Sequence, residues 1–307
     1  MSPLDHEQHQ TVLLQEATSA LITDADGRYV DGTFGRGGHS GALLNKMTDN
    51  GRLLALDKDL QAATIARNLS MQDRRLTVVH GSFAQLSQAT SAMGWVGKVA
   101  GILLDLGVSS PQLDQPERGF SFLKDGPLDM RMDLSSGMTA ADWINSATEA
   151  DMIRVFKEYG EERFARRIAR AIIAERKQCA LLTTAHLAQV VKRANPAWEK
   201  SKHPATRVFQ AIRIHVNNEL QDLVSVLPQM LETLAIGGRM VVISFHSLED
   251  RRVKQFMQRH QRGDKFPKGL PVTDKQLHKR LQILGKVVKP SCAEMQANPR
   301  ARSAGCG

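Results

Sequence analysis

Apolar runs alternate with amphipathic stretches through the first third of the chain, and this rhythm restricts the possible folds more than any other feature. The stretches between the runs, such as "LQAATIARNL" at 60–69, carry apolar residues at helical spacing. Four of the runs are typical of buried strands: "RYVDGTF" (28–34), "GRLLALDKD" (51–59), "RLTVVHGSF" (75–83) and "VAGILLDLG" (99–107). Strands that alternate with helices form βαβ units, so the sequence predicts an α/β fold around a parallel sheet.

A fifth run of this kind, residues 237–247, comes about 130 residues after the fourth, far more than one crossover helix needs. The intervening sequence has helical patterns at 148–195, and a long helix is predicted from about Ala205 to Ala235. We therefore expect a discontinuous core with a helical insertion that recognises the substrate. The predicted boundaries are 1–112 and 214–307 for the core and 113–213 for the insertion.

The C-terminal residues have a weaker strand pattern. Residues 284–289, "LGKVVK", can supply a sixth strand. The last segment, "ARSAGCG" at 301–307, has few β-favouring residues, and two of its final three are glycine. We expect one edge of the fifth strand to lack a ladder partner there.

The net charge of +9 is concentrated in two segments. Residues 151–215 hold 14 Lys and Arg against 6 Asp and Glu, and residues 250–302 hold 14 against 4. The remainder of the chain is therefore net acidic. Two basic segments on an acidic body favour a polyanion such as nucleic acid as partner, with solvated helix faces as the alternative explanation.

Several classes of protein are excluded by composition. The three cysteines are far apart and the histidines are scattered, so neither a disulfide framework nor a metal site is expected. The polar start "MSPLDHEQHQ" and the lack of a long apolar run argue against a secretory or membrane protein. A cytoplasmic location is expected.

A glycine-rich turn directly follows the first strand: "VDGTFGRGGHSG" (30–41) has five glycines in twelve residues. Glycine lets a ligand approach the backbone, and ligands of open α/β sheets bind beyond the carboxyl ends of the strands. The dinucleotide pattern G-x-G-x-x-G fails at Ser40, and the phosphate-loop pattern is absent. Asp57, 22 residues after Gly35, is placed to bond a ribose diol. A ribose without a pyrophosphate cradle favours S-adenosyl-L-methionine; the alternative is a tight structural turn with a surface Asp57.

Two further strand ends carry candidate site residues. Asp105 follows four apolar residues of the fourth strand, where a carboxylate needs a partner, unless it is only a cap or loop acid. After the fifth strand, Ser247 and Asp250 have the spacing of a helix start. His246, directly before them, faces either the mouth of the cleft or the core.

Long blocks of the chain resemble the bacterial RsmH (MraW) family. The blocks are "HQTVLLQEA" (9–17), "DGTFGRGGHS" (31–40), "DLGVSSPQLD" (105–114), "DGPLDMRMD" (125–133), "YGEERFARRIARAI" (159–172), "KHPATRVFQAIRIHVNNEL" (202–220) and "ISFHSLEDR" (243–251). Members of that family are S-adenosylmethionine-dependent methyltransferases that modify the N4 amine of a cytidine in the decoding centre of 16S ribosomal RNA. The resemblance implies a Rossmann-like methyltransferase core with a helical insertion, and 16S rRNA within the small ribosomal subunit as the partner.

The resemblance also implies roles for individual residues. Cofactor contacts fall on Gly37, Gly38, His39, Asp57, Phe83, Asp105 and Gln112. The chemistry of methyl transfer to such an amine adds candidate roles of its own: Asp105, or the backbone carbonyls of its turn, is the candidate catalytic acceptor of an N–H hydrogen bond from the cytosine amine, unless it serves the cofactor alone. Phe120 and Phe122 can stack on a flipped base or pack as a lid. The other candidate RNA contacts are Arg166, Arg170, His203, Arg207, Arg213 and His246.

Two other functions remain open at this level. A nicotinamide-dependent oxidoreductase is disfavoured by the missing third glycine. A non-catalytic RNA-binding protein with a vestigial pocket is disfavoured because each expected pocket position is intact. The sequence also leaves open whether the chain forms a homodimer.

Overall fold

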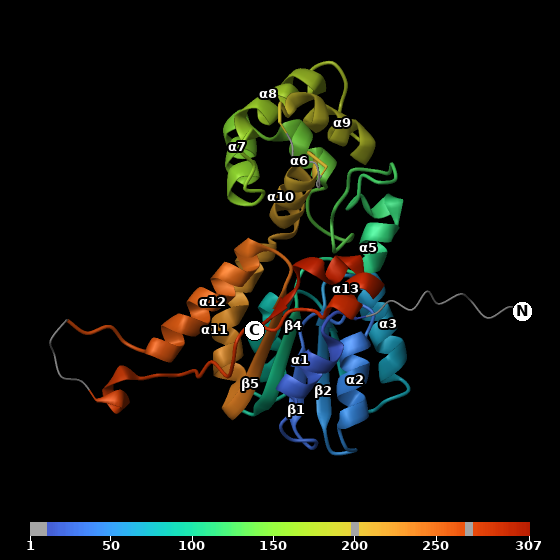
Figure 1. The fold of residues 1–307 in the computed structure, drawn as a ribbon. Helices are drawn as coiled ribbons and strands as arrows, with labels where there is room; N and C mark the ends of the chain where they lie inside the picture. The colour runs from blue at the N-terminus through green and yellow to red at the C-terminus, as the bar shows by residue number, and fades with distance from the viewer. Residues whose placement is uncertain (1–10, 198–202, 268–272) are drawn as a thin grey trace, which may run out of the picture. The chain divides into compact units, whose positions relative to one another are not determined.

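The computed structural model describes residues 11–197, 203–267 and 273–307, and the chain divides into two compact units (Figure 1). The first, here called the sheet unit, comprises Met1–Gly107 and Leu220–Gly307. The second, the helical unit, comprises Val108–Glu219.

The sheet unit is built on a six-stranded sheet, counted over the described residues, in the order β3-β2-β1-β4-β5-β6. The strands are β1 (Arg28–Asp31), β2 (Arg52–Asp57), β3 (Leu76–His80), β4 (Val99–Asp105), β5 (Leu234–Ser244) and β6 (Gly305–Cys306). All neighbours pair in parallel except β6, which is antiparallel to β5. Strand order reverses between β1 and β4, as in Rossmann-like folds. The predicted parallel α/β sheet is confirmed.

Successive strand residues alternate between two apolar cores, one on each face of this sheet. Tyr29 and Leu53 face the core that includes residues of α1 and α2, whereas Val30 and Leu54 face the core of α4, α11 and α12. The helices of this unit are α1 (Leu14–Leu21), α2 (Gly38–Lys46), α3 (Leu60–Ser70), α4 (Leu86–Ala92), α11 (Glu219–Thr233), α12 (Ser247–Arg262) and α13 (Cys292–Ala297), with 3-10 turns η1 (Phe83–Gln85), η3 (Asp274–Leu277) and η4 (Pro299–Ser303). Burial on both faces explains why the strands read as continuous apolar runs.

The helical unit has a core of its own, formed by apolar stripes such as Ile168, Ala169 and Ile172 of α8. Its elements are α5 (Ser110–Asp114), η2 (Pro116–Arg118), α6 (Ala140–Ser146), α7 (Glu149–Glu158), α8 (Ala165–Arg176), α9 (Thr184–Ala194) and α10 (Thr206–Asn217). Among the described helices of either unit, none has the length and apolar character of a membrane span.

The long helix predicted from Ala205 to Ala235 is wrong, because the structure has two helices there. Helix α10 ends at Asn217 and α11 begins at Glu219, with Asn218 between them in the left-handed conformation at φ 55°. Asparagine tolerates this conformation better than most residues, so it can end one helix and start another without an intervening loop. Periodicity alone misses such a break because both helices carry the same apolar spacing.

The expectation of an unpaired edge at the end of β5 is also wrong. Gly305 and Cys306 pair with Ser244 and Ile243, and Val242 and Gly307 exchange two backbone hydrogen bonds of 2.9 and 3.0 Å. On its other side Cys306 exchanges hydrogen bonds of 2.9 Å with Val288, so 284–289 contributes a single bridge instead of a strand. Ladder bonds use only backbone groups, and burial of the Cys306 side chain in the core fixes the register in spite of the low β propensity.

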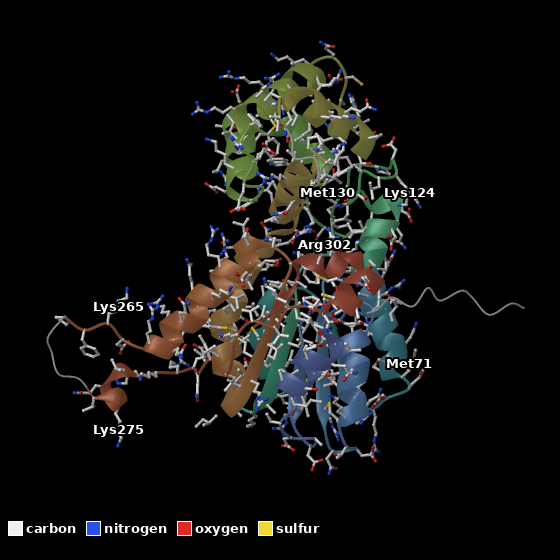
Figure 2. All side chains as sticks on the ribbon, in the orientation of Figure 1. Met71, Lys124, Met130, Lys265, Lys275 and Arg302 are labelled. Carbon is white, nitrogen blue, oxygen red and sulfur yellow. The ribbon has the colours of Figure 1, made fainter. Side chains whose placement is uncertain are left out.

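Beyond α12 the chain forms an extension rich in basic residues, here called the arm (263–267 and 273–289). The second half of the arm folds back on the first half and on the end of α12. The Asp264 N–H at the start of the arm donates to Leu277 O over 2.7 Å, and the Arg280 N–H donates to His260 O of α12 over 3.1 Å. Gly263, at φ 74°, makes the turn at the end of α12. Lys265 and Lys275 lie on this arm (Figure 2).

Candidate active site

Three aspartates end neighbouring parallel strands of the sheet unit. Asp31 ends β1, Asp57 ends β2 and Asp105 ends β4. Parallel pairing aligns these ends, and β1 and β4 are the strands between which the order reverses. A ligand of an open α/β sheet binds at such a point, so the sheet topology places the site here.

The glycine turn joins this edge to the start of α2. Gly35 and Gly37 have φ of 56° and 80°, a conformation that favours glycine. A Cβ on Gly37 would come within 2.7 Å of the Phe34 ring, so side chains are excluded by space as well as by φ. The backbone of the turn is therefore bare, as the sequence predicts for a ligand turn.

Asp57 anchors this turn. Its Oδ2 accepts the Gly35 N–H over 2.7 Å, and its Oδ1 accepts the Asp59 N–H over 2.8 Å. Burial raises the pKa of Asp57 to about 6, although these hydrogen bonds oppose the rise. Each carboxylate oxygen has a second lone pair, so a ribose hydroxyl can still donate to it. The ribose contact stays a prediction.

Asp31, which sequence reasoning missed, is a fully buried member of the same edge. Its Oδ1 accepts the Thr33 N–H over 3.1 Å, and its Oδ2 accepts the Ser40 hydroxyl over 2.7 Å. Burial raises the pKa of Asp31, while His39 and these donors oppose the rise. The signal that singled out Asp105, a carboxylate after an apolar run, was present in "RYVD" as well.

Asp105 and His39 hold polar atoms that lack partners among the described residues. Asp105 Oδ1 and His39 Nε2 are buried without a hydrogen bond, and Asp105 Oδ2 lies 3.6 Å from His39 Nδ1. The backbone of Asp105 is fixed by donation of its N–H to Thr33 Oγ1 over 2.6 Å. Burial raises the pKa of Asp105 well above its usual range, and the charges of Asp31 and Glu249 raise it further. Burial lowers the pKa of His39.

This arrangement fits a cationic ligand that brings hydrogen-bond donors. Buried polar atoms are normally satisfied, so the Asp105 oxygen that finds no partner among the described residues fits a hydrogen-bond donor on a bound ligand. Carboxylates that raise one another's pKa are stabilised by a nearby positive charge. S-adenosylmethionine carries a sulfonium, an ammonium group and a ribose diol, and it therefore fits. The anionic pyrophosphate of a dinucleotide would meet carboxylates instead.

The other predicted cofactor residues differ in position. Gly38 and His39 begin α2 next to Gly37, so the structure groups them with the glycine turn. Phe83 starts η1 after β3 and packs partly against the core. Gln112 belongs to the helical unit, where its Oε1 accepts the Ser109 N–H over 2.9 Å at the start of α5. The structure thus gives Gln112 a helix-capping role.

Among the candidate RNA-binding residues of the helical unit, Phe120 and Arg213 have structural roles. Phe120 is only 6% exposed and belongs to the core, so of its two expected roles the structure favours packing. Arg213 donates two hydrogen bonds of 2.8 Å to Glu219, and this bidentate pair neutralises its charge. Phe122 is half-buried, with ring centroids 4.7 Å from His203 and 4.8 Å from Phe209.

The remaining arginines are more accessible. Arg166 and Arg170 lie exposed on α8, and Arg170 Nε is 3.0 Å from Glu149 Oε1. Arg207 is held by donation of Nη1 to Glu161 O over 3.0 Å. Their contacts with RNA stay predictions.

His246 lies at the end of β5 in the sheet unit and is the N-cap of α12. Glu249 accepts the N–H groups of Phe245 and His246 over 2.9 and 3.4 Å. The predicted cap by Ser247 and Asp250 is therefore displaced by one residue, because Ser247 is already the first residue of the helix. The His246 side chain is 11% exposed, with Nε2 3.1 Å from Glu249 Oε1.

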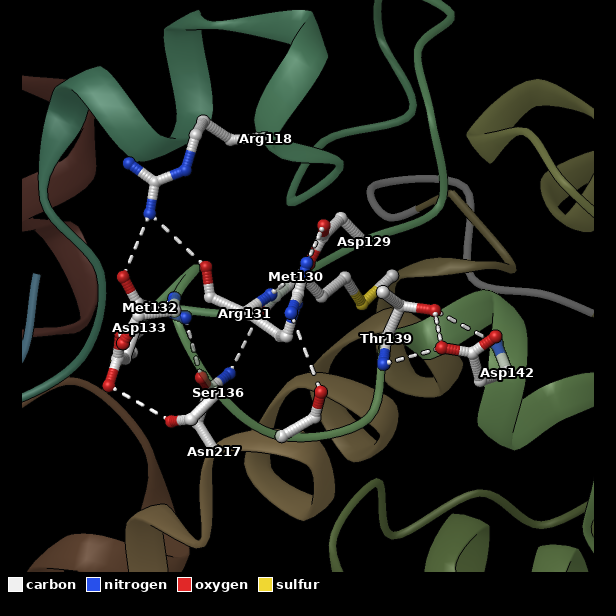
Figure 3. A network of polar contacts seen from close by, with 12 residues as sticks. Arg118, Asp129, Met130, Arg131, Met132, Asp133, Ser136, Thr139, Asp142 and Asn217 are labelled. Atoms are coloured by element: carbon white, nitrogen blue, oxygen red, sulfur yellow. Dashed lines mark hydrogen bonds and ion pairs between the residues drawn. The ribbon is translucent and has the colours of Figure 1, made fainter.

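A polar network fixes the loop of the helical unit that contains "DGPLDMRMD" (Figure 3). Arg118 Nη2 donates to Arg131 O and Met132 O, both over 3.1 Å. Asn217 Oδ1 accepts the Met132 N–H, and its Nδ2 donates to Met130 O, both over 2.7 Å. Met130, at φ 61°, is held in a strained conformation by these contacts. Sequence reasoning assigned no role to Arg118 or Asn217, because their partners are backbone carbonyls and N–H groups.

The Rossmann-like sheet, the bare glycine turn and the acidic strand ends together define an S-adenosylmethionine-dependent methyltransferase core. Comparison with known proteins agrees. The model of the MraW methylase family matches residues 6–306, and the chain belongs to that family.

Two curated relatives are similar over nearly the whole chain, and both are named Ribosomal RNA small subunit methyltransferase H. The protein of Legionella pneumophila (strain Paris) is 56% identical over 97% of this chain and 96% of its own length. That of Chromohalobacter salexigens is 57% identical over 97% of this chain and 89% of its own length. A solved structure, a putative rRNA methylase from Clostridium thermocellum, is 11% identical at a TM-score of 0.39 over 81% of this chain and 82% of that one, too distant to bear on function.

Proposed function

We propose that this chain transfers the methyl group of S-adenosylmethionine to the N4 amine of a cytidine in 16S rRNA of the small ribosomal subunit. Family membership and the names of the relatives support a small-subunit rRNA methyltransferase. The observation that carries the chemistry is the buried Asp105 oxygen beside the glycine turn, which has no partner among the described residues. A ribosomal RNA substrate supports a cytoplasmic location, which is part of this proposal. Whether the chain forms a homodimer stays open.

The bound cofactor supplies an electrophilic methyl group on a sulfonium. The cofactor would be held by the bare backbone of Gly35 and Gly37, by Asp57 at the ribose, and by the negative potential of Asp31 and Asp105 at its cationic end. Phe83, partly exposed after β3, would cover one face of the adenine.

The amine of cytosine is a weak nucleophile because its lone pair is delocalised into the ring. Asp105 Oδ1 would accept one N–H hydrogen bond, which orients the lone pair and stabilises the positive charge that develops on nitrogen. Its raised pKa makes Asp105 a better proton acceptor, and a neighbouring cation favours the ionised form that accepts. The methylated amine is strongly acidic, so it loses its proton without a strong base.

The alternatives are weaker on the same grounds. A nicotinamide oxidoreductase requires a pyrophosphate cradle, whereas the strand ends here are acidic. A vestigial RNA-binding protein would have no need to keep a carboxylate buried and unpaired, at a cost in stability.

The test is to incubate the protein with labelled S-adenosylmethionine and unmodified small ribosomal subunits, and then to map the RNA fragments by mass. We expect one fragment to gain a methyl group on a cytidine base, and Asp105→Asn to abolish the gain. Label on a protein, on another base, or nowhere would contradict the proposal. A thermal-shift series with S-adenosylhomocysteine and NADH separates the alternatives, since only the former should stabilise the protein.

A further inference from the structure

The arm gathers positive charge at the end of α12. Arg259 and Arg262 lie in the last turn of the helix, and the Arg280 N–H donates to His260 O over 3.1 Å, which brings the returning segment to that turn. Lys275 lies in η3, two residues before Leu277, whose carbonyl accepts the Asp264 N–H over 2.7 Å. All four basic side chains are exposed. None of the four forms an ion pair with a described residue.

Three nearby carboxylates whose side chains the structure describes are already engaged. Asp250 pairs with Lys254 at 2.8 Å, and Asp264 pairs with His278 Nδ1 at 2.7 Å. Glu249 is buried and accepts backbone N–H groups. By sequence the arm holds six Lys and Arg against two acids, Asp264 and Asp274, so it keeps a net positive charge. The lowered pKa of His260, caused by burial and by the charges of Arg280 and Arg259, agrees with this.

The helix macrodipole explains only part of the cluster. Basic residues in the last turn of a helix are stabilised by its partial negative charge, which accounts for Arg259 and Arg262. Lys275 and Arg280 come from outside the helix, and a surface cation near a helix C-terminus gains at most about 1 kcal/mol, so the dipole does not account for four like charges at one end. The close approach of Gly263 to Leu277 shows that the segment is packed against the helix end. The fold thus holds like charges together.

We propose that Arg259, Arg262, Lys275 and Arg280 form a surface that binds the phosphate backbone of the ribosomal RNA. This inference rests on the proposed function, because it takes the substrate to be RNA. Three of the four residues are arginines, whose planar guanidinium binds phosphate through two hydrogen bonds. Phe266, on the arm and 39% exposed, offers a ring on which a base can stack. The surface belongs to the sheet unit, so it is a second RNA contact besides the α8 arginines.

The test uses the whole chain with Arg259→Gln, Arg262→Gln and Arg280→Gln combined. A matched control carries Arg67→Gln, Arg74→Gln and Lys98→Gln, which remove the same charge from exposed positions of the same unit. Binding of a 16S rRNA transcript is measured across a salt series. We expect the arm variant to lower the slope of log affinity against log salt by about 3 and the affinity near 0.1 M salt by at least about tenfold.

Equal slopes for the arm variant and the control would overturn the proposal. The arm also exposes Leu284, at 70%, so vesicles containing phosphatidylserine are tested in parallel. Vesicle binding that the arm variant loses while its RNA slope is unchanged would identify a membrane surface instead, and would likewise overturn it. Unchanged affinity for S-adenosylhomocysteine shows that the variant is folded.

The two proposals fail separately. If the wild type methylates small-subunit RNA but the arm variant keeps the control's salt slope, only the arm surface is refuted. If the wild type binds the transcript with a slope that the arm variant loses, yet methylates no cytidine, only the proposed function is refuted.

Discussion

Replacement of Asp57 by Asn tests whether the acidic edge is built for a ligand at the expense of stability. Burial raises the pKa of Asp57 from 3.8 to about 6 in the folded chain. An acid with a raised folded pKa contributes stability that is fully present below its unfolded pKa, near 3.8, and is lost as the pH rises through about 6. The ionised Asp57 therefore weakens the ligand-free protein at neutral pH.

The magnitude follows from the two pKa values. One pH unit of difference corresponds to about 1.4 kcal/mol, so full ionisation lowers the free energy of unfolding by about 3 kcal/mol. Roughly 1.6 kcal/mol of this is already lost at about pH 5, which leaves about 1.4 kcal/mol to be lost between about pH 5 and pH 7.5. Asn also cannot accept both the Gly35 and Asp59 N–H groups as the carboxylate does, but that cost does not vary with pH.

Urea unfolding of the wild type and Asp57→Asn at a series of pH values provides the measurement. The difference between the two free energies should move in favour of the variant by about 1.4 kcal/mol from about pH 5 to pH 7.5. A difference that stays constant over this range would refute the argument that Asp57 is ionised at a cost in the folded protein.

The same variant should bind ligand less well. A hydrogen bond from a ribose hydroxyl to a carboxylate contributes about 2 kcal/mol to the free energy of binding. Its loss in Asp57→Asn should therefore weaken the binding of S-adenosylhomocysteine roughly thirtyfold. Calorimetry above pH 7 measures this, and equal affinities would remove Asp57 from the ribose site.

Three further predictions concern other parts of the chain. Asp105→Asn should raise the Tm of the ligand-free protein at neutral pH, because the raised pKa of Asp105 makes its contribution to stability disappear as the pH rises. The same variant should lower the rate of methyl transfer by about a hundredfold or more. A fall in Tm would contradict the argument. Arg166→Ala with Arg170→Ala should reduce the RNA salt slope by about 2 and leave S-adenosylhomocysteine affinity intact, whereas an unchanged slope would make α8 a solvated face. Asn218→Ala should lower the free energy of unfolding by about 1 kcal/mol in urea and Asn218→Gly should not, because of the φ of 55°; equal losses would count against strain.

The fold was predictable because its signals are local. The runs of the central strands β1, β2 and β4 are continuous and apolar because these strands are buried on both faces, and this pattern survives in the linear sequence. The glycine turn was predictable for a similar reason, because positive φ and close packing at Gly37 restrict the residue type. Asp57 was found through its spacing from that turn.

The sequence was least informative where contacts between residues far apart in the chain decide the structure. Nothing near Gly305 and Cys306 in sequence indicates a strand, since their partners at Val242–Ser244 are some sixty residues away. The sequence left open whether Phe120 stacks on a base or packs, and the tertiary structure encloses its ring. The charge of Arg213 looked available until the break at Asn218 brought Glu219 within 2.8 Å.

By itself, the sequence determined the α/β class, the position of the ligand turn and two of the three aspartates at the sheet edge, because residue type and spacing respond directly to burial and backbone conformation. Only the tertiary structure decided which polar atoms are satisfied. It joins Asp31 to Ser40 and holds Arg280 against the end of α12, and within the described part of the chain it leaves Asp105 Oδ1 without a partner. Hydrogen bonds and charge pairs form between residues distant in the chain, so their presence or absence depends on the folded geometry and not on local pattern.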